Sequence, residues 1–337
     1  MNNRRQYTVA IAGATGAVGV EMIKVLEERN FPVKTLKLLA SSRSVGKKMM
    51  FRGENLTVEE LRHDSFEGVD IALFSAGASI SREFRQRVVD AGAVMIDNSS
   101  AFRMEPDVPL VIPEVNGADV KHHKGVIANP NCSTTILLVA MAPLYRAFGI
   151  KRIIASTYQA TSGAGAKGME EMVEQTKLVL ADQPFTPKVF AHQIAFNIIP
   201  HIDVFTENDY TKEEMKMVYE TRKMLHDDTI MVSCTCVRVP VMRAHSEALN
   251  IEFAKPVTPE MARAVLGAAP GVKLVDDPAG KRYPMPIEAA DHDDVLVGRI
   301  RQDISRTDGR GLDLFISGDQ VLKGAALNAV QIAELLT

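Results

Sequence analysis

The sequence predicts an α/β protein of two domains, one built on a parallel sheet and one an α+β domain on a mainly antiparallel sheet. Continuous apolar strands alternate with amphipathic helices in the first third, which is typical of parallel strands covered on both faces. Beyond about residue 130, longer helices and longer strands mix. A chain of 337 residues also exceeds what one hydrophobic core usually holds.

The elements follow this order along the chain. For the first domain we expect a strand over 7–12, a helix over 18–29, a strand over 36–40, a strand from 69, a helix over 81–91, and strands from 93 and 125. For the second we expect a helix over 133–148 and strands from 151, over 231–240 and over 248–254. An amphipathic helix from Gly324 should pack back on the first domain. The predicted domains are therefore 1–130 with 321–337, and 131–320.

Composition excludes several classes of protein. With 46% hydrophobic and 24% charged residues, the chain has the profile of a soluble globular protein. A formal net charge of -3 supplies no large basic surface, so no nucleic-acid partner is expected. There is no apolar run long enough for a bilayer and no leader pattern, so no membrane partner is expected. Three cysteines form no disulfide framework, which indicates a reducing, cytoplasmic location.

A glycine-rich turn follows the first strand and opens the first helix. Its residues are Gly13, Ala14, Thr15, Gly16, Ala17 and Val18, with Gly19 after them. The glycines serve a tight turn, close approach of the backbone to a pyrophosphate, and close packing of helix on strand. The helix N-terminus offers free N–H groups to phosphate. Because strand and helix flank the motif correctly, a Rossmann-type nucleotide domain is predicted over a merely structural turn.

The residues at the end of the second predicted strand indicate whether the cofactor is NAD or NADP. An NAD site usually carries Asp or Glu there, about 20 residues past the glycines, to bind the ribose 2′-OH. This chain instead has Ser41, Ser42 and Arg43. Hydroxyls and a guanidinium suit a 2′-phosphate, so NADP is predicted. The alternative is a polar loop with a solvated Arg43.

Cys132 lies between a strand and a helix, in the segment NPNCSTT. A helix N-terminus favours thiolate over thiol, which makes Cys132 the candidate nucleophile. The Asn131 amide beside it is a candidate donor to an oxyanion. Cys234 and Cys236 alternate along a strand-like run without further metal ligands nearby, so packed thiols are expected there.

A catalytic thiol needs a group that moves protons. Three histidines compete for this role: His192, His201 and His245. His245 is the best candidate, although an isolated histidine is usually structural.

The chain resembles the aspartate-β-semialdehyde dehydrogenases over nearly its whole length. The resemblance is carried, in order, by GATGAVG, ASSRSVGK, DNSSAFRM, IANPNCST, ATSGAG, VRVPVMRAHSEALN and SGDQVLKGAALN. N-acetyl-γ-glutamyl-phosphate reductase typically shows GCYPT around its cysteine and glyceraldehyde-3-phosphate dehydrogenase SCTTN. PNCST in this chain favours the aspartyl enzymes.

The resemblance implies roles for individual residues. Cys132 is the implied thioester nucleophile and His245 the general acid and base. Gln159 is implied to position the acyl group, and Arg238 to bind the substrate carboxylate through paired hydrogen bonds. The remaining implied roles are a phosphate pocket at Arg103 with Asn131, and cofactor contacts at Ser162, Gly163 and Gln320.

Glu213 and Lys216 admit two interpretations. Thr211 and Glu214 form a predicted capping box, which places Glu213 and Lys216 three apart on one helix face. The pattern alone favours a solvent-exposed ion pair. The resemblance instead implies that Lys216 binds phosphate and Glu213 the substrate amine.

Arg238 and His245 raise a geometric difficulty. Seven residues apart, they would point to opposite faces of one regular strand. Pro240 between them cannot donate a ladder hydrogen bond, so a bulge or bend is expected.

The resemblance implies reduction of L-aspartyl 4-phosphate to L-aspartate 4-semialdehyde with NADPH, in lysine, threonine, methionine and diaminopimelate biosynthesis. The expected partners are a small-molecule substrate, inorganic phosphate and a second copy of the chain, as a homodimer or possibly a tetramer. One alternative is another acyl-phosphate or acyl-CoA reductase on the same scaffold, such as N-acetyl-γ-glutamyl-phosphate reductase. A non-catalytic NADP-binding module is an alternative from a different class.

Overall fold

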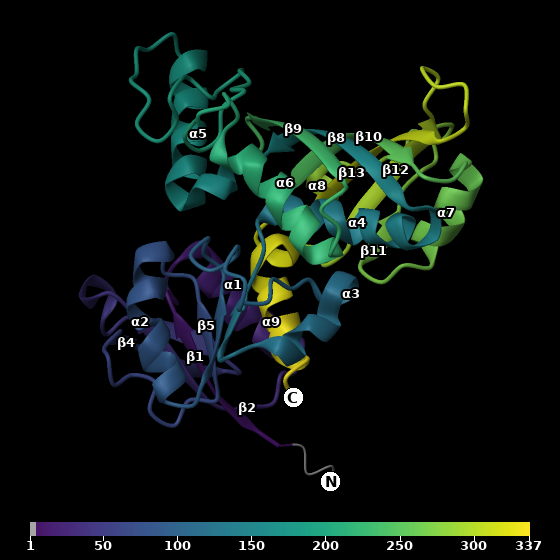
Figure 1. Cartoon of the computed structure of the whole chain (residues 1–337). Coiled ribbons are helices and arrows are strands. Elements are labelled where there is room, and N and C mark those ends of the chain that lie inside the picture. Colours follow the sequence, from purple (N-terminus) through teal and green to yellow (C-terminus); the bar gives the residue numbers. More distant parts are fainter. Residues whose placement is uncertain (1–4) are drawn as a thin grey trace. The chain divides into compact units, whose positions relative to one another are not determined.

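The computed structural model describes residues 5–337, which form two compact units (Figure 1). Of the described residues, the first unit contains 5–131 together with Ala325–Thr337. The second contains Cys132–Gly324. The first unit thus includes a C-terminal segment that is separated from the rest of this unit by almost 200 residues of sequence.

A seven-stranded sheet forms the centre of the first unit, in the order β3-β4-β2-β1-β5-β6-β7. Neighbouring strands are parallel except β3 and β4, which confirms the predicted parallel sheet. The short pair β3 and β4 was not predicted. The strands are β1 (Tyr7–Ala12), β2 (Val33–Ala40), β3 (Lys48–Phe51), β4 (Glu54–Glu60), β5 (Ile71–Phe74), β6 (Val94–Asp97) and β7 (Val126–Ala128).

The helices of the first unit come from both ends of the chain. They are α1 (Ala17–Glu28), α2 (Ala78–Asp90), α3 (Pro113–Asn116) and α9 (Leu327–Glu334), with 3₁₀ turns η1 (Ser42–Ser44) and η2 (Gly117–His122). Helices α1 and α2 connect parallel strands and bury one apolar face each, as the crossover geometry requires.

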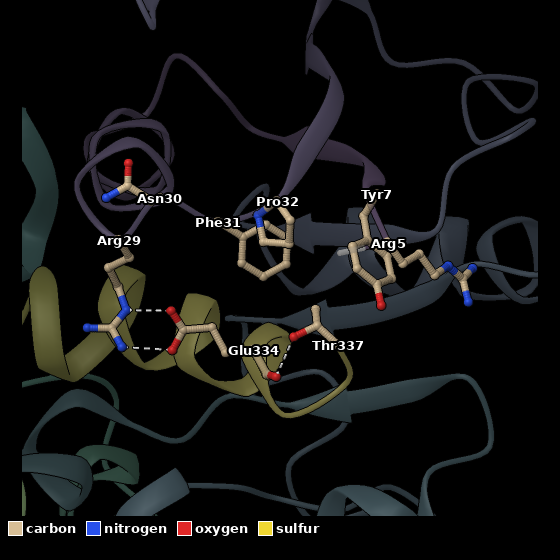
Figure 2. Close-up of a pocket in the computed structure, with 8 residues that line it drawn as sticks. All are labelled: Arg5, Tyr7, Arg29, Asn30, Phe31, Pro32, Glu334 and Thr337. Atoms are coloured by element: carbon tan, nitrogen blue, oxygen red, sulfur yellow. Dashed lines mark hydrogen bonds and ion pairs between the residues drawn. The ribbon is translucent and has the colours of Figure 1, made fainter. Parts of the chain in front are cut away.

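Two polar contacts fix α9 within this unit. The Arg29 guanidinium donates two hydrogen bonds of 2.7 Å to the Glu334 carboxylate, beside a cavity of about 480 Å³ (Figure 2). The buried Asn328 amide donates to the Asn129 side-chain oxygen at 2.6 Å and to the Val111 carbonyl at 2.9 Å. Because a buried amide without partners is costly, Asn328 ties the last helix to the strand ends of the first sheet.

A six-stranded sheet forms the second unit, in the order β11-β12-β13-β10-β8-β9. Three of its pairings are antiparallel, and the outermost pairings β11/β12 and β8/β9 are parallel. This confirms the predicted mainly antiparallel sheet. Its strands are β8 (Ile150–Gln159), β9 (Met231–Arg238), β10 (His245–Phe253), β11 (Val272–Leu274), β12 (Val295–Gln302) and β13 (Gly311–Gly318).

Helix α4 (Cys132–Phe148) is the central helix of the second unit, and most of its residues are buried. The residues Ile136, Leu137 and Leu138 are fully covered, so α4 packs as a core helix and its first residue is held firmly. The remaining helical segments are η3 (Thr161–Ala164), α5 (Gly165–Leu180), α6 (Lys212–Leu225), α7 (Pro259–Gly267), α8 (Pro286–Ala289) and the π-helical turn η4 (Leu322–Ala326).

Within residues 5–337, the helices are all too short or too polar to cross a membrane.

Candidate active site and nucleotide site

The glycine turn after β1 is as tight as the sequence predicts. Gly13 has φ +89°, and a Cβ there would lie 2.4 Å from the Ser75 carbonyl oxygen. A Cβ on Gly19 would lie 2.3 Å from the Gly13 carbonyl oxygen. Gly16 is the N-cap of α1 and brings no side chain to the first N–H groups. These N–H groups can therefore donate hydrogen bonds to a pyrophosphate.

The loop after β2 lies beside this turn. The Thr15 and Ser44 hydroxyls are 3.2 Å apart, which joins the two loops. Ser41, Ser42 and Arg43 are exposed at the end of β2, and the strand end carries no carboxylate. The chemistry of these groups fits a phosphorylated ribose. The close approach of the Ser75 backbone to Gly13 was not predicted, although Ser75, Ala76 and Gly77 follow a strand that ends at the same sheet edge.

Cys132 is the first residue of α4, and its thiol is partly exposed. A Cβ on Gly324 would lie 2.8 Å from the Cys132 Cβ, so only glycine allows η4 to pass beside the nucleophile candidate. Cys234 and Cys236 are buried, and burial raises the pKa of both thiols above the ordinary value. The part of the chain that the structure describes contains no group of metal ligands, and the C-x-C pair packs in the core as predicted.

Arg238 and His245 belong to different strands. β9 ends at Arg238 and β10 begins at His245, with a turn between them in which Ala244 has φ +71°. The predicted bend is thus a complete change of strand. Both side chains face Gly163: a Cβ there would lie 2.7 Å from Arg238 Nη1 and 3.3 Å from His245 Cε1. The spacing of seven therefore does not separate them.

The backbone of Ala160 contacts both side chains. Its carbonyl accepts from Arg238 Nη1 at 2.6 Å, and its N–H donates to His245 Nδ1 at 3.1 Å. Because Nδ1 accepts, the proton of the neutral imidazole is on Nε2, which lies 3.5 Å from the Gln159 amide nitrogen. Burial, and then the Arg238 charge, lower the pKa of His245 well below its ordinary value. His245 is accordingly neutral near pH 7.

Arg238 is also buried, which lowers its pKa, while Glu213 and Cys132 favour its charged form. The other two histidine candidates lie elsewhere: His192 is exposed, and the His201 ring stacks on Phe205 with centroids 4.6 Å apart.

Gln159 begins a chain of polar contacts. Its amide nitrogen donates to Glu213 Oε1 at 3.2 Å, and its oxygen accepts from the Thr157 hydroxyl at 3.0 Å. Glu213 Oε2 accepts from Lys216 at 3.0 Å. The predicted capping box at the start of α6 is present. The expectation of a solvent-exposed pair was wrong, because the Glu213 side chain is only 7% exposed and that of Lys216 25%.

Ser162 and Gln320 are neighbours in the same unit. The Gln320 amide nitrogen donates to the Ser162 hydroxyl, and its oxygen accepts from the Ala244 N–H at 2.8 Å. Gln320 therefore joins the turn that leads into His245 to Ser162, the residue before Gly163.

Asn131 and Arg103 lie in the first unit. Asn131 is buried and directly precedes Cys132 in the chain. Arg103 is buried too, and it donates to the Asn129 carbonyl at 2.9 Å and to the Asn98 carbonyl at 3.2 Å. Its guanidinium is thus held by backbone from two strand ends.

Comparisons with known proteins agree with this arrangement. Residues 8–123 match the model of the semialdehyde dehydrogenase NAD binding domain, and residues 141–323 that of the semialdehyde dehydrogenase dimerisation domain. The chain is 57% identical to the aspartate-semialdehyde dehydrogenase of Aquifex aeolicus, over 98% of each chain.

Two solved structures extend the comparison. Aspartate semialdehyde dehydrogenase II of Vibrio cholerae, complexed with ASA, has a TM-score of 0.96 and 48% identity, covering 99% of this chain and 98% of that one. The Candida albicans enzyme with NADP has a TM-score of 0.76 and 27% identity, covering 98% of both chains.

Proposed function

The chain belongs to the aspartate-semialdehyde dehydrogenase family, and on this basis we propose how it reduces L-aspartyl 4-phosphate to L-aspartate 4-semialdehyde with NADPH, through a thioester on Cys132. The observation that carries the proposal is a partly exposed cysteine, Cys132, at the first residue of α4. In the same unit, Arg238 and His245 both bind the backbone of Ala160, Arg238 through its carbonyl and His245 through its N–H.

The Cys132 sulfur attacks the acyl carbonyl, and the carbon–oxygen bond to phosphate breaks. The Asn131 amide holds the oxyanion, while Arg103 and Lys216 offset the charge of the leaving phosphate. When bound, NADPH supplies the hydride that reduces the thioester. His245 donates a proton through Nε2 to the substrate oxygen that hydride addition leaves negatively charged, because its Nδ1 already accepts from the Ala160 N–H. Cleavage of the carbon–sulfur bond releases the aldehyde and restores Cys132.

Substrate recognition is assigned to four side chains. The Arg238 guanidinium binds the substrate carboxylate, for which its planar fork is suited. Glu213 binds the substrate amine, Lys216 the phosphate, and Gln159 positions the acyl group. The support is that Gln159 and Lys216 both contact Glu213, so the three polar groups lie together.

The cofactor assignment is NADP rather than NAD. It is supported by the exposed hydroxyls and guanidinium of Ser41, Ser42 and Arg43 at the end of β2. Ser162, Gly163 and Gln320 are assigned to the nicotinamide side, supported by the Gln320–Ser162 hydrogen bond and by the absence of room for a Cβ at Gly163.

The assembly is proposed to be a homodimer, possibly a tetramer, because residues 141–323 match a dimerisation domain. Three free thiols support a reducing, cytoplasmic location. The proposed product would serve lysine, threonine, methionine and diaminopimelate biosynthesis.

The test is phosphate-dependent reduction of NADP by purified protein supplied with aspartate semialdehyde. The wild-type protein should be active, and Cys132→Ala should lose activity by a factor on the order of 10³ or more. Cys234→Ala is the matched control, since its buried thiol has no assigned role. Near-normal turnover by Cys132→Ala would refute the thioester.

A further inference from the structure

Lys216 lies between two carboxylates. Its ammonium donates to Glu213 Oε2 at 3.0 Å and to Asp203 Oδ2 at 2.9 Å. Burial alone would lower the pKa of Lys216, but these two partners raise it above the ordinary value. The lysine is therefore charged, and two of its three N–H donors are engaged by the chain itself.

Asp203 is held ready for this contact by its own backbone. It has φ +69°, a left-handed conformation that Asp tolerates better than most residues. Oδ1 accepts from the Val204 N–H at 2.8 Å, which leaves Oδ2 directed to Lys216. Burial acts to raise the pKa of Asp203, but Lys216 and the Val204 N–H lower it below its ordinary value. Asp203 is thus ionised at neutral pH.

The two carboxylates differ in how firmly they are held. Glu213 is 7% exposed, sits on α6 and has the Gln159 amide as a second partner. Asp203 is 34% exposed and sits on a loop. An incoming anion would therefore displace Asp203 more easily, while Glu213 continues to position the ammonium.

We propose that Asp203 competes with phosphate for Lys216, so that it weakens phosphate binding at the active site without positioning the lysine. This inference rests on the proposed role of Lys216 in the function above. One ammonium and two carboxylates leave a single net negative charge, which repels a phosphate anion. Removing the Asp203 charge leaves the Glu213–Lys216 pair neutral. Lys212, which also acts on Asp203, stays in place.

The experiment measures initial rates of NADP reduction at varied phosphate. Asp203→Asn keeps an oxygen for the Val204 N–H and suits the left-handed backbone, but it removes the charge. Its phosphate KM should fall about two- to fivefold, the range of a partly exposed charge pair. The KM for aspartate semialdehyde should stay within about twofold of the wild-type value. A general structural perturbation would instead change both KM values.

Asp209→Asn is the matched control. Asp209 lies on the same loop, is exposed, and has φ +64°. The substitution Asp209→Asn therefore removes the same charge at a residue with a similar backbone conformation. Its phosphate KM should not change. The effect of Asp203→Asn should also shrink at high salt, because screening weakens the exposed carboxylate.

Two further variants separate this inference from the proposed function. Lys216→Ala should raise the phosphate KM, and adding Asp203→Asn to it should have no further effect. An unchanged phosphate KM in Lys216→Ala would refute both the phosphate role and the inference. A raised KM in Lys216→Ala, combined with an unchanged or raised KM in Asp203→Asn, would overturn the inference alone.

Discussion

Arg238 and His245 bind opposite sides of one residue, because Arg238 donates to the Ala160 carbonyl while the Ala160 N–H donates to His245. Ala160 follows directly after β8, whose two neighbours in the sheet are β9 and β10. The backbone of the middle strand thus fixes the distance between two side chains on its flanking strands.

Arg238→Lys should raise the KM for aspartate semialdehyde by about 10- to 100-fold, with a smaller effect on kcat. Lysine keeps the charge but loses the planar fork, and the lost charge-assisted bond is worth about 1.5–3 kcal/mol. Steady-state kinetics measures this split. Arg301→Lys, at a half-exposed position on β12, serves as control. An unchanged Michaelis constant would count against the carboxylate assignment.

Iodoacetamide at neutral pH should modify Cys132 in the native protein and leave Cys234 and Cys236 unmodified. The first thiol is partly exposed, whereas the other two are buried and have raised pKa values. Peptide mass spectrometry locates the label, and unfolding in guanidinium chloride should expose all three cysteines. Native Cys132→Ala should take up almost no label; rapid labelling of Cys234 would contradict the packing.

Arg43→Ala should raise the KM for NADP by about 10- to 100-fold while changing that for NAD little. The reason is the loss of a charged partner for the 2′-phosphate, about 1.5–3 kcal/mol. The measurement compares the two cofactors under one condition, with Arg62→Ala, an exposed arginine paired with Glu60, as control. Equal weakening with both cofactors would argue that Arg43 is a general loop residue.

Glu247→Gln should stabilise the protein near pH 7, and the gain should grow as pH rises from about 5. Glu247 is fully buried without a partner for either oxygen in the described structure, and burial raises its pKa well above its ordinary value. The unfolded chain loses this proton above about pH 4.3 while the folded chain keeps it. Unfolding is therefore favoured with increasing pH, by up to about 1.4 kcal/mol per pH unit until the folded pKa is reached.

Urea unfolding of wild type and Glu247→Gln at pH 5, 6, 7 and 8, at one protein concentration, measures this difference. Glu252→Gln, farther along β10 and partly exposed, is the control. A stability difference that is constant over this pH range would mean that Glu247 is ionised in the folded protein.

The local features of this protein could be predicted from its sequence. The glycine turn and α1 follow from the order of strand, glycines and helix pattern over residues 7–28, and the α4 start lies one residue from the predicted position. The β3–β4 pair was missed because most residues of its strands are exposed or half-buried. Such strands show no buried apolar run.

The non-local features could not be predicted. Asp203 is one aspartate in a loop, and only the folded chain brings it to Lys216, thirteen residues away. The burial of Glu213 likewise depends on Gln159, 54 residues earlier. Helical spacing predicts that Glu213 and Lys216 form a pair. The solvent exposure of this pair, however, depends on which distant residues pack against it in the folded chain.

The position of α9 has a consequence for synthesis on the ribosome. Asn129 obtains its partner Asn328 only from the last ten residues of the chain. The first sheet is therefore translated early, but the buried side-chain oxygen of Asn129 gains this partner only once residue 328 has been translated. The sequence of the second unit, by contrast, has been translated completely by then. A chain that ends before residue 328 would lack this partner, so the part of the protein that is translated first would be the unfinished part.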